Sequence, residues 1–167
     1  MTKAARQRRS GLSSAARLAA VQALYQIDLS GAGSEDALAM VLAGGATLDE
    51  TGLAAEADPE LASIIVRGVS QASMIERLDR MIDSALAASW SVSRLEILMR
   101  AILRAGVFEL LECPEVPPKV VINEYVEVAH AFFDRGEPGM VNGVLDTLAH
   151  RLRPAADLTS QPPSGGG

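Results

Sequence analysis

The most apolar stretch of the chain runs from Leu95 to Leu111, and we predict that it forms the central helix of the fold. In a helical projection nearly all of its positions are apolar, apart from one narrow polar stripe. That stripe consists of Ser93, Glu96, Arg100 and Arg104. A helix that is apolar on almost every side has to be enclosed by other elements. A capping box of Ser93 and Glu96 predicts its start, and Cys113-Pro114 predicts its end.

Shorter amphipathic segments lie on both sides of this helix. Their apolar residues recur every three or four positions, which is the helical period. The predicted helices cover about 13–29, 34–42, 59–86, 119–134 and 140–152, with a loop over 44–58. Asp58-Pro59 is a clear start signal, because Asp is a good N-cap and Pro is tolerated at the first helical position. Residues 59–86 carry two apolar stripes, which fit either one bent helix or two.

The composition favours an all-α fold. Of the 167 residues 49% are hydrophobic but only 4% are aromatic, and the prevalent Ala and Leu are good helix formers. A chain of this length can bury one core, so we expect one domain over 13–153, divided at most into two small bundles. Gly11 interrupts the helical pattern, and residues 1–12 are therefore predicted to be a flexible arm. The Pro-, Gly- and Ser-rich residues 154–167 are predicted to be a disordered tail.

The net charge of −6 hides a strong asymmetry. The first seventeen residues contain five basic residues and no acidic one, and the rest of the chain contains ten basic against 21 acidic residues. The five are Lys3, Arg6, Arg8, Arg9 and Arg17. A basic segment at one end of an acidic body is typical of a nucleic-acid contact. The alternative is a disordered terminus whose arginines only aid solubility.

The residues capable of chemistry do not form a recognisable catalytic or metal-binding pattern. The sequence has no Gly-rich phosphate loop, no His-x-x-x-His pair and no Gly-x-Ser-x-Gly elbow. His130 and His150 fall on polar helix faces, and Cys113 is the single cysteine. We therefore expect no enzyme, no cofactor and no metal. Without a signal peptide or a long apolar span the chain is expected to be cytoplasmic and to have no membrane contact.

Four stretches occur in an order and spacing that resemble the bacterial NusB antitermination family. They are Ala16–Gln26, Leu103-Arg104 with Phe108-Glu109-Leu110, Val121–Ala129 and Val141–Asp146. The resemblance covers about residues 14–152. It implies an all-helical bundle of about seven helices, in which two small bundles share the long central helix.

The resemblance also implies a function without catalysis. Members of the family pair with NusE, a small-subunit ribosomal protein, and together hold the boxA element of nascent RNA. The pair joins an RNA polymerase antitermination complex, notably in ribosomal RNA operons. The implied RNA-binding residues are Arg6, Arg8, Arg9, Arg17 and Tyr25. The candidate partner-binding residues are Arg100, Glu112 and Lys119. Tyr25 also lies on the apolar stripe of its helix, so a core role is an equal alternative.

Several positions depart from the family pattern. Family members usually carry an arginine run directly before the position of Ala16, whereas Arg8-Arg9 lie several residues upstream. Met140 stands where an aromatic residue is frequent, and Met99 stands where a glutamate facing NusE is frequent.

Three further residues have expected structural roles. Arg104 could belong to a partner surface on the polar stripe of the central helix, or it could equally be tied internally to a carboxylate such as Asp146, because an arginine on a mostly buried helix needs a partner. Trp90 is expected to plug the bundle. Gly143 is expected to permit the close approach of another helix.

Two alternative functions follow from the same residues. A protein-only scaffold or homodimer could hide the RNA face around Arg17 and Tyr25. NusB-like domains also precede the catalytic part of RNA cytosine methyltransferases. The second alternative is disfavoured, because the chain has no room for a cofactor-binding α/β domain.

Overall fold

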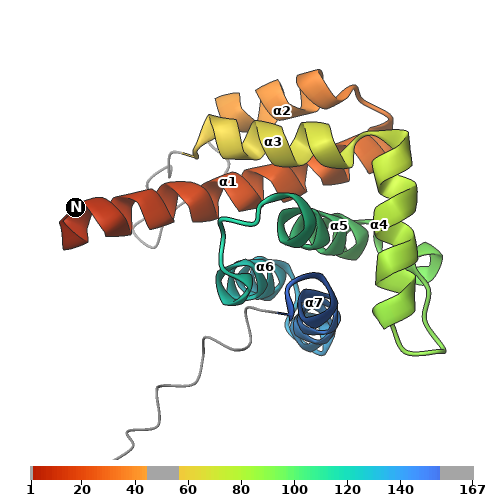
Figure 1. The fold of residues 1–167 in the computed structure, drawn as a ribbon. Coiled ribbons are helices and arrows are strands. Elements are labelled where there is room, and N and C mark those ends of the chain that lie inside the picture. Colours follow the sequence, from red (N-terminus) through yellow and green to blue (C-terminus); the bar gives the residue numbers. More distant parts are fainter. Residues whose placement is uncertain (1, 45–56, 155–167) are drawn as a thin grey trace, which may run out of the picture.

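The computed structural model describes residues 2–44 and 57–154, and these parts of the chain form seven α-helices and one short 3₁₀ helix (Figure 1). The elements are α1 (Lys3–Ser30), α2 (Ser34–Ala43), α3 (Pro59–Val69), α4 (Ala72–Ala85), η1 (Val92–Arg94), α5 (Ile97–Glu112), α6 (Pro118–Phe132) and α7 (Glu137–Leu152). The described ranges thus confirm the all-α class and the number of helices. The predicted tail beyond Pro154 and most of the predicted loop at 44–58 lie outside them. None of the described helices is long and apolar enough to cross a membrane.

Helix α5 is the central helix, as predicted. Every residue from Ala101 to Leu110 is buried, and α5 packs against α1, α3, α4, α6 and α7. Its start differs from the prediction, because Leu95 has an extended backbone after η1 and the helix begins at Ile97. The expected capping box is absent. Glu96 occupies the N-cap without a side-chain hydrogen bond, and the Ser93 hydroxyl pairs with that of Ser91 instead.

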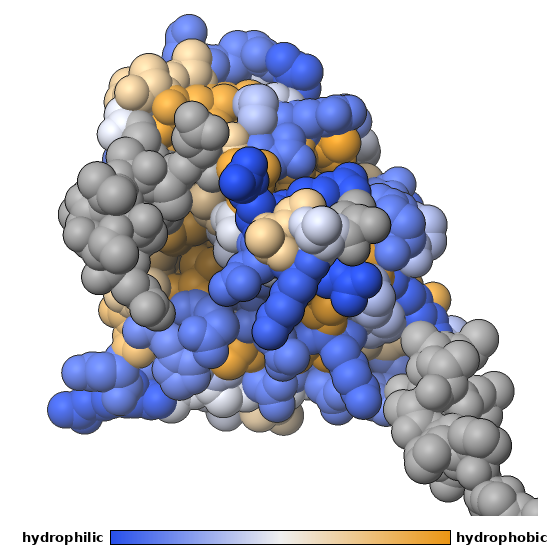
Figure 2. Space-filling view, turned by 90° about the vertical axis from the view of Figure 1, so that its left-hand side faces the viewer, coloured by the Kyte–Doolittle hydropathy of each residue, from blue (hydrophilic) through white to orange (hydrophobic). Residues whose placement is uncertain are grey.

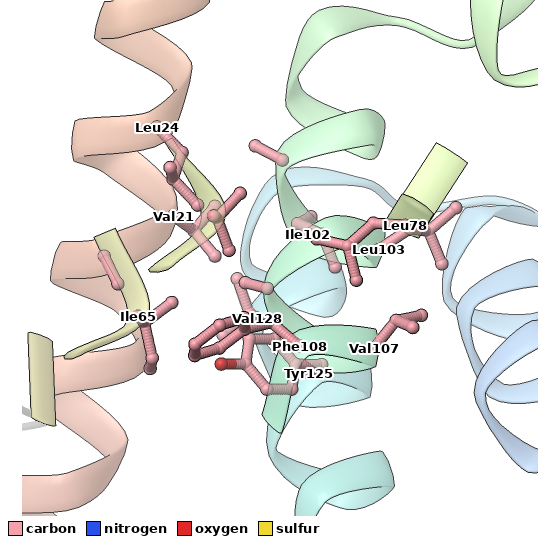
Figure 3. Packing of buried hydrophobic residues seen from close by; sticks show 14 of the residues in the cluster. Val21, Leu24, Ile65, Leu78, Ile102, Leu103, Val107, Phe108, Tyr125 and Val128 are labelled. Carbon is pink, nitrogen blue, oxygen red and sulfur yellow. The ribbon is translucent and has the colours of Figure 1, made fainter. Parts of the chain in front are cut away.

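The other helices lie in two groups on either side of α5. Helices α2 and α3 pack on α1 at one side, whereas α6 and α7 pack on each other at the opposite side, and α4 contacts both α5 and α7 (Figure 1). Side chains from both groups meet on α5. Figure 3 shows Val21 of α1, Ile65 of α3 and Tyr125 of α6 converging near Phe108. This arrangement is the predicted pair of small bundles with a shared helix.

Two glycines allow the helices around α5 to approach closely. A Cβ atom on Gly68 of α3 would lie 2.2 Å from the ring of Phe108, and one on Gly106 would lie 2.9 Å from Leu145 of α7. The expectation for Gly143 is wrong, because a Cβ atom there would have no neighbour within 4 Å. Small residues at helix crossings therefore lie on α3 and on the central helix itself.

Helix α1 begins ten residues earlier than predicted. Thr2 is its N-cap, and its hydroxyl accepts a hydrogen bond of 3.2 Å from the backbone N–H of Ala5. The predicted interruption of the helix at Gly11 is therefore wrong, because α1 runs through residues 3–12 of the predicted flexible arm. The intervening Ala, Arg and Gln residues are good helix formers, and one Gly in an exposed helix costs only about 1 kcal/mol. Gly11 is consequently too weak a break to end the helix.

The start of α3 joins this early part of α1 to the body. Asp58 caps α3 as predicted, since its carboxylate accepts from the N–H groups of Glu60 and Leu61. Its own N–H donates to the carbonyl of Leu12 at 3.1 Å. Residues 59–86 form two helices that separate at Ser70 and Gln71, which decides between the two alternatives of the sequence pattern.

Candidate nucleic-acid interface

The first turns of α1 form an exposed basic segment. All residues from Thr2 to Gly11 are exposed, and they include Lys3, Arg6, Arg8 and Arg9. We call residues 3–11 the basic segment. Arg6 and Arg9 are three residues apart and share one side of the helix, whereas Arg8 points to another. Figure 2, which looks onto this end of α1, shows hydrophilic residues gathered there. The positive end of the helix dipole adds to their charge, and the first turn holds no acidic residue.

Arg17 lies apart from these arginines, in the interior of the protein. Its side chain is only 4% exposed, and its guanidinium donates two hydrogen bonds to the fully buried Glu109 carboxylate, at 2.8 and 2.9 Å. Arg17 therefore does not face a surface open to RNA in this structure, and its direct RNA contact stays a prediction. Arg17 follows Arg9 by eight residues, or about 12 Å of helix, and by that point α1 has entered the core.

Hydrogen bonds and opposite charge hold the buried side chains of Arg17 and Glu109 together. Burial opposes the positive charge of Arg17, but the hydrogen bonds and the negative charge of Glu109 outweigh it, so the pKa of Arg17 is raised. Burial also raises the pKa of Tyr125 well above its ordinary value, and the charge of Glu109 adds to the effect. The pair therefore fixes α1 against α5 and cannot be separated without leaving a buried charge.

Glu124 of α6 extends this cluster towards the surface. Its carboxylate accepts a hydrogen bond of 2.9 Å from the Ser14 hydroxyl, and it lies 3.9 Å from the guanidinium of Arg17. Ser14 comes three residues after the basic segment. The exposed Lys119 precedes Glu124 on α6 by five residues, or about 7 Å. The cluster thus places the start of α6 beside the base of the basic segment.

The predicted partner-binding residues do not form one site. Arg100 is half-buried near the start of α5, and its Nε atom is buried without a hydrogen-bond partner. Glu112, at the other end of the same helix, is exposed, as is Lys119. Twelve helical residues separate Arg100 from Glu112, which is about 18 Å. Tyr25 on α1 is half-buried, so its predicted RNA contact remains a prediction.

Arg104 is tied internally, but not to the predicted carboxylate. Its guanidinium donates to Asp79 of α4 through two hydrogen bonds of 2.8 Å and to Asp28 of α1 at 3.0 Å. Burial opposes its charge, but Asp79 and Asp28 outweigh that effect and raise the pKa of Arg104. The expectation of Asp146 is wrong, because that residue is exposed beside His150 on α7. Arg104 therefore joins α1, α4 and α5.

Sequence reasoning missed Arg153, which follows the last turn of α7. Its guanidinium donates to the carbonyls of Glu109, Leu110 and Cys113 at 3.1, 3.0 and 2.7 Å, and also to that of Val116. The last carbonyls of a helix lack internal donors, and a cation there is favourable. Arg153 therefore holds the end of α5 on which Glu109 lies. Its position after α7 carries no signal for this contact with residues about forty positions away.

Cys113 has the properties of an incidental thiol. Its side chain is buried, and burial together with the charges of Glu109 and Glu115 raises its pKa to about 11. A thiol with such a pKa stays protonated and unreactive at neutral pH. Among the described residues no three His, Cys, Asp or Glu side chains are grouped to hold a metal ion.

A pocket opens where α5 and α7 begin. Its volume is about 490 Å³, and it is lined by Trp90, Arg94, Leu95, Glu96, Met99, Gly136, Glu137 and Met140. Trp90 does not plug the bundle as expected, because the residue is 47% exposed. Met140 faces the same pocket. We call it the Trp90 pocket.

Comparison with known proteins places this geometry in a family. The model of the NusB family matches residues 14–150, which is most of the chain. The chain belongs to the NusB family. It is similar to the transcription antitermination protein NusB of Rhizobium rhizogenes, with 50% identity over 83% of this chain and 86% of that protein.

Solved structures of the NusB family agree with the fold. T. maritima NusB matches with a TM-score of 0.69 and 28% identity, over 91% of this chain and 96% of that one. A structure of the antitermination factors NusB and NusE in complex with double-stranded RNA matches with a TM-score of 0.68 and 26% identity, over 87% of this chain and 98% of the matched chain. The NusB family assignment also confirms that the protein is not an enzyme.

Three of the four stretches that carry the resemblance to the NusB family meet at one place in the structure. Arg17 lies in the first stretch, Glu109 in the second and Glu124 in the third, and these are the residues of the buried cluster. The signatures therefore describe how α1, α5 and α6 are joined beside the basic segment. They do not include the exposed Arg6, Arg8 and Arg9.

Proposed function

We propose that the protein is a transcription antitermination factor that binds the boxA element of nascent RNA together with NusE. In this role it joins the RNA polymerase antitermination complex and supports the transcription of ribosomal RNA, in the cytoplasm. The observation that carries the proposal is the basic segment, an exposed and helical group of cations on an otherwise acidic protein. The relative solved with NusE and double-stranded RNA supports it.

The basic segment suits a phosphate backbone. Exposed arginines at the start of a helix can contact several phosphates while the helix dipole favours the same negative charge. Arg17, Glu109 and Glu124 have a positioning role, since they hold the helix that carries Arg6, Arg8 and Arg9. Lys119 lies on the same side through the contact between Ser14 and Glu124. We therefore place the RNA along the basic segment and the start of α6.

For NusE we propose the end of α5 that carries Arg100. An arginine whose Nε atom is buried without a partner gains a hydrogen bond when an acceptor arrives. Glu112 at the other end of α5 and Lys119 at the start of α6 provide an internal comparison. Arg100→Glu and Lys119→Glu change the charge by the same amount, the first near the start of α5 and the second on α6, beyond the opposite end of α5. Calorimetry with NusE should show weaker binding for the first variant only, and equal affinity of the two variants would contradict the assignment.

The experiment that tests the proposed function is RNA binding across a salt series. A boxA-containing strand and a scrambled strand are compared, each with and without NusE. We expect a preference for boxA that strengthens with NusE, together with a negative dependence of the affinity on salt. Equal and purely salt-driven binding to both strands would contradict the proposal and leave a helical protein with an unspecific basic segment.

A further inference from the structure

We propose that exposed arginines on α4 and α7 form a docking surface for an acidic, amphipathic helix of a further protein partner. These arginines are Arg77 and Arg80 of α4 and Arg151 of α7, and we call them the arginine stripe. Figure 1 shows α4 at the end of the molecule opposite the start of α1. The arginine stripe is therefore remote from the basic segment, and the inference does not depend on the proposed RNA binding.

The three arginines of the stripe lie in one line. Arg77, Arg80 and Ser84 are spaced by three and four residues, so their side chains share one side of α4. The hydroxyl of Ser84 accepts a hydrogen bond of 2.9 Å from the guanidinium of Arg151 and donates to the carbonyl of Met81. Arg151 is thereby held against the last turn of α4. Seven helical residues separate Arg77 from Ser84, so the stripe covers about 10 Å.

The positive charge of the stripe is not neutralised from within the protein. In the described parts of the chain no carboxylate forms an ion pair with any of its arginines. Of the three carboxylates of α4, that of Asp79 binds Arg104, and that of Asp83 accepts from the backbone N–H of Val92. Only Glu76 remains, and it lies on the neighbouring side of the helix. One carboxylate does not offset three guanidinium groups, so this surface stays positive on a protein of net charge −6.

An apolar flank beside the stripe favours a protein over a nucleic acid. Met74 and Met81 of α4 are half-buried, lie seven residues apart and pack against the core. Methionine side chains adapt to the shape of a partner and are common at protein-binding surfaces. Helix α4 contains no aromatic residue on which a base could stack. A partner helix with acidic residues on one side and apolar residues next to them would match both the stripe and its flank.

Charge complementarity sets the spacing that the partner needs. A guanidinium group binds a carboxylate through two parallel hydrogen bonds. Carboxylates at positions i, i+3 and i+7 of a helix repeat the spacing of Arg77, Arg80 and Ser84, to which Arg151 is bound. Such a helix meets the whole stripe when it lies alongside α4. The net charge of −6 opposes the binding of an acidic helix elsewhere on the protein, so a local positive surface is required.

The first experiment uses a synthetic peptide as the probe. The peptide has about 14 residues, or four helical turns, with Glu at i, i+3 and i+7 and Leu at the adjoining positions. A control peptide has the same composition in scrambled order. Fluorescence anisotropy with the full chain should show binding of the ordered peptide that is roughly tenfold or more tighter than that of the control. Equal affinity for the two peptides would overturn the inference.

Two triple variants with the same change of charge separate the two basic surfaces. One combines Arg77→Gln, Arg80→Gln and Arg151→Gln, and the other replaces the three arginines of the basic segment by Gln. The first should weaken binding of the ordered peptide roughly tenfold or more and leave RNA binding unchanged, and the second should do the reverse. An equal loss of peptide binding in both variants would overturn the inference, because binding would then follow the overall charge.

A measurement on the unmodified protein keeps the test valid if a variant folds poorly. Backbone amide signals of the isotope-labelled chain are followed by NMR during titration with the ordered peptide. The signals of α4 and of the last turn of α7 should shift, since these elements carry the stripe. Shifts confined to the basic segment would overturn the inference.

Two further outcomes would assign the stripe to a partner already proposed. Displacement of the peptide by a single-stranded RNA, with shifts of the same amide signals, would make the stripe a nucleic-acid contact. A loss of NusE affinity in the stripe variant, measured by calorimetry, would make it part of the NusE surface. Either result would overturn the inference of a further partner. Neither would contradict the proposed function, which the boxA comparison tests separately.

Discussion

The two stretches of α1 before and after Ser14 both contain arginine, but they differ in burial and in the contacts that their arginines make. From Thr2 to Gly11 every residue is exposed, and the helix is held by its own hydrogen bonds and the Thr2 cap. From Ala15 to Leu24 all residues except Leu18 and Gln22 are buried. The arginines of the first stretch face solvent, whereas Arg17 in the second is locked to Glu109.

This difference separates binding from stability along a single helix. A charge removed from the basic segment should change the affinity for RNA and leave the fold intact, because surface substitutions rarely cost much stability. A charge removed at Arg17 should change the fold, because Glu109 would be left buried and unpaired. The following variants test this separation.

The largest expected effect is that of Arg17→Met. Removing one partner of a buried ion pair leaves an uncompensated charge and costs roughly 3–5 kcal/mol. Urea denaturation followed by circular dichroism should show this loss of the free energy of unfolding. The double variant Arg17→Met with Glu109→Leu should recover much of it, since apolar replacement of a complete buried pair is often neutral.

The double variant also decides the role of Arg17 in RNA binding. If Arg17 only positions α1, the folded double variant should bind RNA within a few-fold of the unmodified chain. A loss as large as that of removing the exposed arginines would contradict the positioning role.

The second effect is that of replacing Arg6, Arg8 and Arg9 together by Gln. Three phosphate contacts to a single strand contribute about −2 to the slope of log affinity against log salt, which corresponds to roughly 100-fold in affinity at 0.1 M salt. RNA titrations at several salt concentrations measure both quantities. The melting temperature should be nearly unchanged. Arg77 and Arg80 are exposed on α4 and provide the control. Replacing both by Gln should leave the salt dependence of RNA binding unchanged. An equal reduction of the slope in this control would mean that RNA binding depends on the overall charge and not on the basic segment.

The sequence was sufficient to predict the elements that depend on local patterns. The continuous apolar run of α5 can only be a buried helix, and Asp58-Pro59 starts α3 as expected. The start of α1 was not predictable from its apolar pattern, because an exposed helix has no apolar face. Its Ala, Arg and Gln residues favour a helix, but the prediction gave more weight to Gly11 as a helix breaker.

The partners of the buried arginines could not be predicted for a different reason. Arg17 pairs with Glu109 at a separation of 92 residues, and Arg104 with Asp28 at a separation of 76. Such pairs depend on how the helices are arranged in space, to which the local sequence gives no access. The pattern did predict that Arg104 would need a carboxylate. The Trp90 pocket likewise joins two turns that are distant in sequence, and only the fold brings Trp90 and Met140 together.

A smaller effect is expected at the boundary between the two stretches. Ser14→Ala removes the hydroxyl that donates towards Glu124 at 2.9 Å and the carbonyl of Ser10 at 3.0 Å. Loss of a hydrogen bond to a charged group costs about 1.5–3 kcal/mol of stability. The higher helix propensity of Ala offsets part of this loss. Denaturation should show a loss of about 1–2 kcal/mol. Ser13→Ala, which changes the neighbouring half-buried residue, should not destabilise the protein, and equal losses at both positions would contradict the role of the contact.

The smallest expected effect is that of Gly11→Ala, which should stabilise the exposed first stretch of α1. A Cβ atom on Gly11 would have no neighbour within 4 Å, and the residue does not have a positive φ angle. Gly11→Ala should therefore stabilise the protein by about 0.5–1 kcal/mol, which raises the melting temperature by a few degrees. Gly68→Ala is the control with the opposite expected result: it should destabilise the protein, because its Cβ atom would clash with Phe108.

If the basic segment binds RNA as a helix, Gly11→Ala should also tighten RNA binding slightly, since less conformational freedom is lost on association. Weaker RNA binding by a more stable protein would mean that the segment has to unwind to reach the phosphates.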